Sequence, residues 1–244
     1  MKKHIPNFIT LLNLFCGSIA VLFAVNGNMI ATAIFVFLGI FFDFFDGLLA
    51  RKLKVQSELG LQLDSLADMV TSGLVPGLVM FHLFNLAGSD WIEFSANNTF
   101  GTAFSVSSNN FLPFFGLLIT LASAYRLANF NIDVNQTDSF VGLPTPANTL
   151  LILSFPLIME FQNNDVMNAI ILNKWFLIAI TLISSFLLNA NIKLLALKFK
   201  NWTFKDNAAR YILIIIAAIL LVVLQFAAIP LIIIAYIIIS LLNK

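Results

Sequence analysis

Apolar residues dominate the chain in long segments that are separated by short polar breaks. Because a membrane-spanning helix needs about 20 mostly apolar residues, these segments predict spans at residues 8–25, 29–50, 60–87, 111–130, 146–162, 175–190, 209–226 and 229–243. The last two are rich in Ile and Leu, and a break near Pro230 separates them. We therefore expect an all-α transmembrane bundle of about eight spans, folded as a single domain over residues 1–244.

The composition supports a membrane protein. Of the 244 residues, 60% are hydrophobic and 10% are charged, whereas about a quarter of the residues of a soluble domain are charged. The net charge of +1 provides no large basic surface for nucleic acid. Cys16 is the single cysteine, which excludes an intrachain disulfide. The basic, then apolar N-terminus has no convincing cleavage site, so we expect it to form a retained first helix.

Basic residues predict the orientation in the membrane, because Lys and Arg accumulate in loops that stay in the cytoplasm. With eight spans and the N-terminus inside, only Lys174 of the 13 Lys and Arg residues falls in an outside segment. The longest predicted outer loop, about 88–110, contains no basic residue. We therefore expect both termini and the 51–59 loop on the cytoplasmic side of an inner or cell membrane.

Four aspartates lie near the predicted cytoplasmic ends of the second and third spans. Positions three or four residues apart share one face of a helix. Asp43 and Asp46 therefore form one acidic stripe, and Asp64 and Asp68 form another. The loop between the two helices is short, which predicts antiparallel neighbours whose stripes converge. Ionisable residues within spans are costly, and they usually face a cavity and mark function.

A divalent cation would neutralise the repulsion among these carboxylates. Arg51, Lys52 and Lys54 in the loop cannot easily reach all four acids. Mg²⁺ and similar hard ions prefer carboxylate oxygen and are commonly held together with substrate phosphates. No His or Cys lies near the acids in the sequence, which argues against a dedicated zinc site. A proton or cation pathway, as in transporters, is the alternative interpretation.

Three small residues, Gly47, Ala50 and Gly60, lie in register with the acids. They leave the facing helix surfaces bare, so that a ligand can approach the backbone. Small residues also favour close helix packing in membranes. Because all three align with four acids, we favour the ligand interpretation.

The spacing of these residues is distinctive. The chain contains Asp43-x-x-Asp46-Gly47-x-x-Ala50-Arg51, then eight residues, then Gly60-x-x-x-Asp64-x-x-x-Asp68. This pattern resembles the signature of the CDP-alcohol phosphatidyltransferase family, and every fixed position is present. The stretches PNFITLLNLFCG, YRLANFN and FVGLPTPAN resemble the branch of the family that uses serine. Members of that branch often have a basic residue where this chain has Asn129.

The resemblance implies a reaction, a cofactor and an assembly. A phosphatidyl group would pass from CDP-diacylglycerol to L-serine, giving phosphatidylserine and CMP. Mg²⁺ or Mn²⁺ would be held by Asp43, Asp46 and Asp64, while Asp68 would act as a further ligand and as the base. The enzyme would be a homodimer embedded in membrane lipid. The remaining signature positions, Gly47, Ala50, Arg51 and Gly60, would line the site for the CDP-lipid.

Other polar residues near this side are candidates for substrate contacts. Asn7, Thr10 and Asn13 share one face of the first span, where they can hydrogen-bond the nucleotide or the acids; capping of the helix start is the alternative. Arg126 either snorkels to the interface or pairs with a lipid phosphate or the serine carboxylate. Arg51 either contacts a nucleotide phosphate or holds the loop.

Direct attack by the acceptor is expected rather than a covalent histidine intermediate. His4 lies near the N-terminus, and His82 falls toward the outer end of the third span, far from the acids. The nearest alternative function is a sister enzyme that uses glycerol 3-phosphate or inositol. A phosphorylated acceptor needs additional basic residues near the site, and their scarcity favours an unphosphorylated acceptor.

Overall fold

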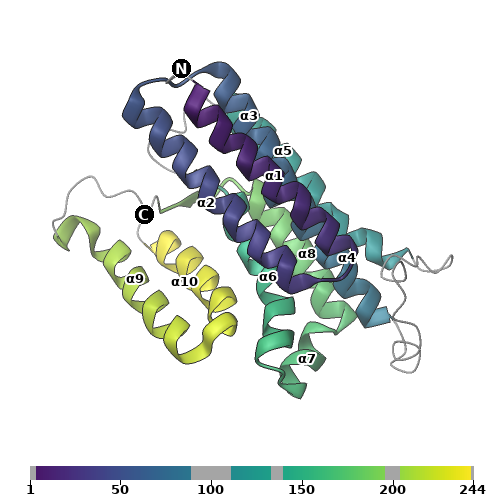
Figure 1. Cartoon of the computed structure of the whole chain (residues 1–244). Helices are drawn as coiled ribbons and strands as arrows, with labels where there is room; N and C mark the ends of the chain where they lie inside the picture. The colour runs from purple at the N-terminus through teal and green to yellow at the C-terminus, as the bar shows by residue number, and fades with distance from the viewer. Residues whose placement is uncertain (1–3, 89–110, 133–139, 196–203, 243–244) are drawn as a thin grey trace.

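The computed structural model describes residues 4–88, 111–132, 140–195 and 204–242. Helices dominate these ranges and pack into one bundle, with α9 and α10 beside its main body (Figure 1). The α-helices are α1 (Ile5–Val25), α2 (Met29–Leu53), α3 (Glu58–Asp68), α4 (Val75–Gly88), α5 (Leu118–Ile132), α6 (Thr145–Phe161), α7 (Asp165–Ile171), α8 (Lys174–Asn189), α9 (Phe204–Leu224) and α10 (Ala228–Leu242).

Shorter elements connect or extend these helices. A π-helix, η2 (Met69–Leu74), joins α3 to α4, and a 3₁₀-helix, η4 (Leu112–Leu117), leads into α5. A second 3₁₀-helix, η5 (Gln225–Ala227), separates α9 from α10. The strands β1 (Phe140–Val141) and β2 (Lys193–Leu194) pair antiparallel. The predicted outer loop at 88–110 lies almost entirely outside the described residues.

The predicted all-α membrane bundle is confirmed, but the predicted count of eight spans is not. Among the described residues, five helical stretches are long and apolar enough to cross a membrane, or six if α7 and α8, bent by 61°, form one span. The predicted span at 175–190 corresponds to α8, whose 16 residues count only together with α7. Two further sources explain the rest of the shortfall. The helix α6 has 17 residues, and the residues 207–242 form one apolar stretch by this criterion, although α9 and α10 lie side by side (Figure 1).

Two short connections bring α1, α2 and α3, the first three helices of the chain, together in space. Gly27, with a positive φ of 74°, turns the chain after α1, and Asn28 caps α2 by accepting a hydrogen bond from Ala31 N. Lys54 ends α2 with a φ of 54°, and Ser57 caps α3 three residues later. The helix α1 packs against both α2 and α3. It therefore forms a common wall behind the two acidic stripes.

The interior of the bundle is organised around α4. Val75, Val79, Leu83 and Phe84 have no exposed surface, and α4 contacts α1, α5, α6 and α8. It continues directly from α3 through η2, so the buried helix and the acidic helix are one unbroken element, Glu58–Gly88. The packing of α4 in the core therefore fixes the position of the acids of α3 along the bundle.

Backbone hydrogen bonds hold residues 142 and 143, which precede α6, against the end of α8 and the residues that follow it. Gly142, at a φ of 75°, donates its N–H to Ile192 O, and Leu143 N donates to Leu187 O at 2.8 Å. Any side chain at Gly142 would meet the backbone oxygen of Leu188. These bonds join the start of α6 to the end of α8, beside the end of α5 that carries Arg126.

Gly116 marks the closest approach of η4 to α4. A Cβ atom at this position would lie 2.7 Å from Phe81 N and 2.9 Å from the Met80 carbonyl carbon. Because the clash is with backbone, we expect Gly116→Ala to lower the free energy of unfolding by about 1–3 kcal/mol, the usual cost of overpacking a core. Thermal unfolding in detergent measures this change. The lipid-facing Leu121→Ala, at a position 65% exposed, is the control, and equal stability of the two variants would contradict the packing account.

Candidate active site

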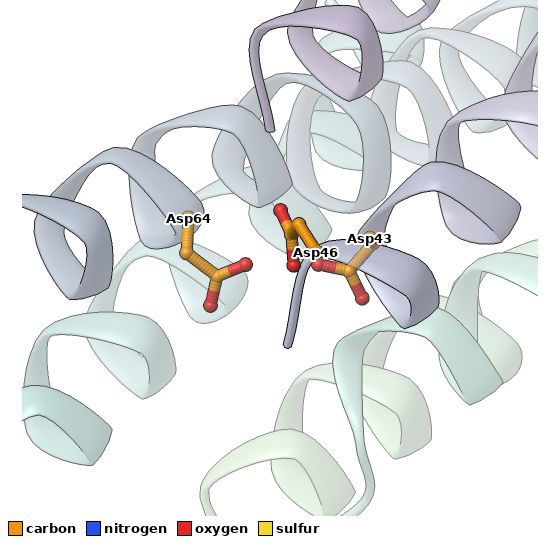
Figure 2. A group of neighbouring side chains, drawn as sticks. All are labelled: Asp43, Asp46 and Asp64. Atoms are coloured by element: carbon orange, nitrogen blue, oxygen red, sulfur yellow. The ribbon is translucent and has the colours of Figure 1, made fainter. Parts of the chain in front are cut away.

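Three aspartates from two helices converge at one point in the structure. Asp43 and Asp46 project from α2, and Asp64 reaches toward them from α3 (Figure 2). Each side chain offers one carboxylate oxygen, and these oxygens lie within 4.8 Å of one another. Asp46 is buried, and the other two are half-buried. The predicted convergence of the two stripes is therefore confirmed for these three acids.

The donor set of this cluster fits a hard divalent cation. Full negative charges 4.8 Å apart repel by about 3 kcal/mol for each pair at an effective dielectric constant near 20. Carboxylate oxygens are the ligands that Mg²⁺ and related ions prefer, and a bound cation converts that repulsion into attraction. The Arg51 guanidinium lies beside Gly47 and acts on Asp46 through its charge, but its side chain is exposed and compensates the cluster only in part.

Asp68 lies one turn further along α3 and is not one of the three clustered acids. Its Oδ1 accepts a hydrogen bond of 3.2 Å from the Asn13 side-chain amide. The guanidinium of Arg126 acts on Asp68 through its charge. Asp68 therefore has its own partners on α1 and α5, and its predicted place among the metal ligands remains a prediction.

The polar face of α1 contacts the acids directly. The Thr10 hydroxyl donates to Asp46 Oδ2 at 2.5 Å, and Asn13 donates to Asp68. The predicted hydrogen bonding of this face to the acids is confirmed, whereas His4, which precedes the helix, makes no side-chain capping bond. Asn7 Oδ1 lies 3.2 Å from the position that a Cβ of Gly60 would occupy.

The small residues of the signature line the approach to the cluster. Gly47, Ala50 and Gly60 are all half-buried. A Cβ at Gly47 would meet only the Arg51 guanidinium, at 3.9 Å, so the space beside this glycine is open. Gly60 is tighter, because a Cβ there would press on Asn7 and Ser57. Contact of these residues with a CDP-lipid remains a prediction.

The sequence left two alternatives for Arg126, and the burial of its side chain distinguishes them. It is only 8% exposed, and its Nε has no hydrogen-bond partner among the described residues. A snorkelling arginine keeps its head in water, so burial contradicts the snorkelling alternative. The side chain lines a cavity of about 310 Å³, together with Asn129, Phe130, Ile132, Val141, Leu188, Asn189 and Ala190.

Several neighbours of Arg126 come from parts of the chain that sequence reasoning did not connect to the site. Val141 of β1 and Asn189 at the end of α8 line the cavity. Tyr236 of α10 lies within electrostatic range of Arg126. The Tyr236 hydroxyl donates to Leu195 O. Tyr236 is the one aromatic residue of the predicted span 229–243, and nothing in that pattern pointed to the site.

A second cavity lies at the other end of α2 and α4. It measures about 280 Å³ and is lined in part by Met29, His82 and Glu160. Met29 begins α2, whereas Asp43 and Asp46 lie beyond its midpoint. His82 is therefore remote from the acids, as predicted, and takes no part in the candidate site.

Comparison with known proteins identifies the family of the chain. The family model for CDP-alcohol phosphatidyltransferases matches residues 3–187, which includes all four aspartates and more than half of the chain. The chain belongs to the CDP-alcohol phosphatidyltransferase family. The match ends within α8, so α9 and α10 lie beyond it.

Curated members of the family resemble this phosphatidyltransferase at moderate identity. A CDP-diacylglycerol–serine O-phosphatidyltransferase of Bacillus subtilis is 35% identical over 159 residues, which cover 63% of this chain and 76% of that protein. One from Methanocaldococcus jannaschii is 28% identical over 68% of this chain and 66% of its own length. An archaetidylserine synthase of Methanothermobacter thermautotrophicus is 27% identical over 62% of this chain and 57% of its own length.

The carboxylate cluster generates a prediction about metal binding. Mn²⁺ at one hundred times its dissociation constant should stabilise the wild-type protein by about 2.7 kcal/mol through mass action. Asp64→Asn should lose this stabilisation while remaining at least as stable as wild type without metal, because one repelling charge is removed. Thermal unfolding with and without Mn²⁺ measures both effects.

Glu58→Gln is the matched control, since Glu58 is an exposed acid in the first turn of the same helix. This variant should keep the full response to Mn²⁺. An equal response of Asp64→Asn and wild type would contradict the predicted metal site.

Proposed function

We propose that this phosphatidyltransferase uses L-serine as its acceptor and CDP-diacylglycerol as its donor, and that it produces phosphatidylserine and CMP in phospholipid biosynthesis. The observation that carries the proposal is the pairing of the three-carboxylate cluster with a buried arginine close to Asp68. The relatives add support, because the Bacillus subtilis and Methanocaldococcus jannaschii proteins carry serine in their names. The archaetidylserine synthase does so as well, although its name specifies a different lipid.

The carboxylate cluster is assigned to the donor. Asp43, Asp46 and Asp64 would hold Mg²⁺ or Mn²⁺ against the pyrophosphate of the CDP-lipid, with Asp68 as a further ligand. When bound, the metal supplies neutralisation of the charge that develops on the departing CMP. Arg51 lies beside the open space at Gly47, where its guanidinium can pair with a phosphate oxygen. Thr10, Asn7, Gly60 and Ala50 would complete the wall around the nucleotide.

Asp68 is assigned to the acceptor. A serine hydroxyl is a weak nucleophile until its proton is accepted, and a carboxylate within hydrogen-bond reach can accept it. The hydroxyl oxygen then forms a bond to the phosphorus that carries diacylglycerol, the phosphoanhydride bond to CMP breaks, and CMP leaves with that electron pair. The proton resides on Asp68 until the site opens to water.

Arg126 is assigned to the carboxylate of serine. Arg126 is buried and acts on Asp68 through its charge, and its Nε is free of partners among the described residues. A guanidinium pairs with a carboxylate through two parallel hydrogen bonds, which would orient the serine hydroxyl toward the base. Asn129 and Asn189 line the same cavity and offer further polar groups to a small amino acid.

Three broader features of the proposal rest on the sequence. The distribution of basic residues supports a site and both termini on the cytoplasmic side of the inner or cell membrane. The family resemblance supports a homodimer. The chain over residues 1–244 would act as a single catalytic domain.

A direct assay tests the acceptor. Purified protein with CDP-diacylglycerol and Mn²⁺ or Mg²⁺ should release CMP and form phosphatidylserine with L-serine, and neither glycerol 3-phosphate nor inositol should support comparable release. Asp68→Asn should lower the turnover number by about 10²–10⁴-fold, the usual contribution of a general base. A preference for glycerol 3-phosphate or inositol would replace the proposed acceptor, and a folded Asp68→Asn variant with normal turnover would remove the base.

The role of Arg126 gives a separate prediction. Arg126→Lys keeps the charge but loses the paired geometry, so the KM for serine should rise by about tenfold or more while the KM for CDP-diacylglycerol stays unchanged. Lys174→Gln, at the opposite end of α8 from Asn189, is the control. A rise in the KM for the CDP-lipid alone would place Arg126 on the donor instead.

A further inference from the structure

The hydrogen bonds around Asp68 continue beyond the site into the interior of the bundle. Asn13 has no exposed surface; its Nδ2 donates to Asp68 Oδ1 at 3.2 Å, and its Oδ1 accepts the Thr71 hydroxyl at 2.8 Å. A carboxylate can only accept hydrogen bonds, so the nitrogen of the amide must face Asp68. The Thr71 hydroxyl, which can donate or accept, then donates to the oxygen of the amide, and the two bonds together hold the amide between Asp68 and Thr71.

Thr71 itself is confined by two glycines from different helices. A Cβ at Gly17 of α1 would overlap the Thr71 hydroxyl oxygen, and a Cβ at Gly39 of α2 would lie 2.7 Å from the Thr71 methyl carbon. The same atom at Gly39 would lie 2.9 Å from Asn13 Oδ1. The absence of a side chain at both glycines therefore leaves the space that the Thr71 side chain occupies beside Asn13.

The backbone around Thr71 is also held from outside. Thr71 belongs to the π-helix η2, in which the wider turn leaves carbonyl groups to be satisfied by other partners. Ser72 O accepts the Thr149 hydroxyl of α6 at 2.9 Å, and Gly73 O accepts the Thr120 hydroxyl of α5 at 3.1 Å. Bonds from α5 and α6 thus fix the position of η2, which begins at the residue after Asp68.

We propose that Asn13 and Thr71 are positioning residues for Asp68, acting in series. Thr71 holds the Asn13 amide in place through its oxygen, and the amide holds Oδ1 of Asp68 so that Oδ2 remains directed toward the acceptor. This inference rests on the proposed function, because it assigns a purpose to the orientation of the base. Both bonds of the Asn13 side chain go to protein groups, so the effect of Asn13 and Thr71 on the reaction passes through the Asp68 carboxylate.

A double-mutant cycle tests the series arrangement. Thr71→Val removes the hydroxyl at constant shape and should lower kcat by about tenfold, and Asn13→Ala should lower it by about ten- to a hundredfold, since small misplacements of a catalytic group have effects of this size. Because Thr71 acts only through Asn13, Thr71→Val should cause little further loss in the Asn13→Ala background. The KM for CDP-diacylglycerol should stay near that of wild type in all three variants.

Two single variants separate positioning from a general structural role. Thr71→Ser keeps the hydroxyl and should restore kcat to within about twofold of wild type, because the orienting bond is retained. Thr32→Val removes another fully buried threonine hydroxyl, whose bond is to its own helix at Asn28 O, and should leave kcat unchanged. Additive losses in the double variant, or equal losses in Thr71→Ser and Thr71→Val, would overturn the proposal.

Turnover is measured as CMP release with whichever acceptor gives the fastest rate, so a wrong acceptor assignment does not alter the ratios. If the wild-type protein releases no CMP with any acceptor, the proposed function fails. Thermal unfolding of the wild type, Thr71→Val, Asn13→Ala and the double variant then tests separately whether the two hydrogen bonds are coupled. Coupled bonds give non-additive shifts in Tm, whereas additive shifts would show that Thr71 and Asn13 act independently.

Discussion

Mutual repulsion among carboxylates inside an apolar bundle is the constraint on which this structure depends. Asp43, Asp46 and Asp64 bring three oxygens within 4.8 Å of one another, in a chain whose residues are 60% hydrophobic. Such a cluster persists only where the surrounding helices hold it and its charge is neutralised. The unbroken element from Glu58 to Gly88 meets the first requirement, because its buried half anchors its acidic half.

The helix α1 gives the acids different hydrogen-bond partners. Thr10 bonds Asp46, and one turn later Asn13 bonds Asp68. These two contacts give different hydrogen-bond partners to Asp46, a member of the three-carboxylate cluster, and to Asp68. One face of a single helix therefore sets the geometry on both sides of the proposed reaction.

The acceptor side is assembled from segments that are distant in sequence. Arg126 comes from α5, Asn189 from the end of α8, and Val141 from the short strand β1, which pairs with β2. Tyr236 interacts with Arg126 from α10, beyond residues 3–187 that match the family model. The C-terminal hairpin of α9 and α10 thus contributes to the surroundings of the site although it lies outside the shared family region.

The sequence by itself determined the helical membrane architecture and the acidic cluster. Hydrophobic length requires no tertiary information, and residues three or four apart on a helix must share a face, so the spacing of Asp43, Asp46 and Asp64 predicted their convergence. The polar face of α1 was also visible, but the alternatives of capping and of bonding to the acids could not be separated by periodicity.

Tertiary structure decided the features that depend on packing between distant helices. The hydrogen bond from Asn13 to Asp68, the burial of Arg126 and the fit of Thr71 between Gly17 and Gly39 all arise where helices distant in sequence meet. The π-helix after Asp68 is likewise supported by threonines from α5 and α6. Local sequence specifies which face a residue occupies, whereas the partner that this face meets is set by the depth and rotation of every neighbouring helix.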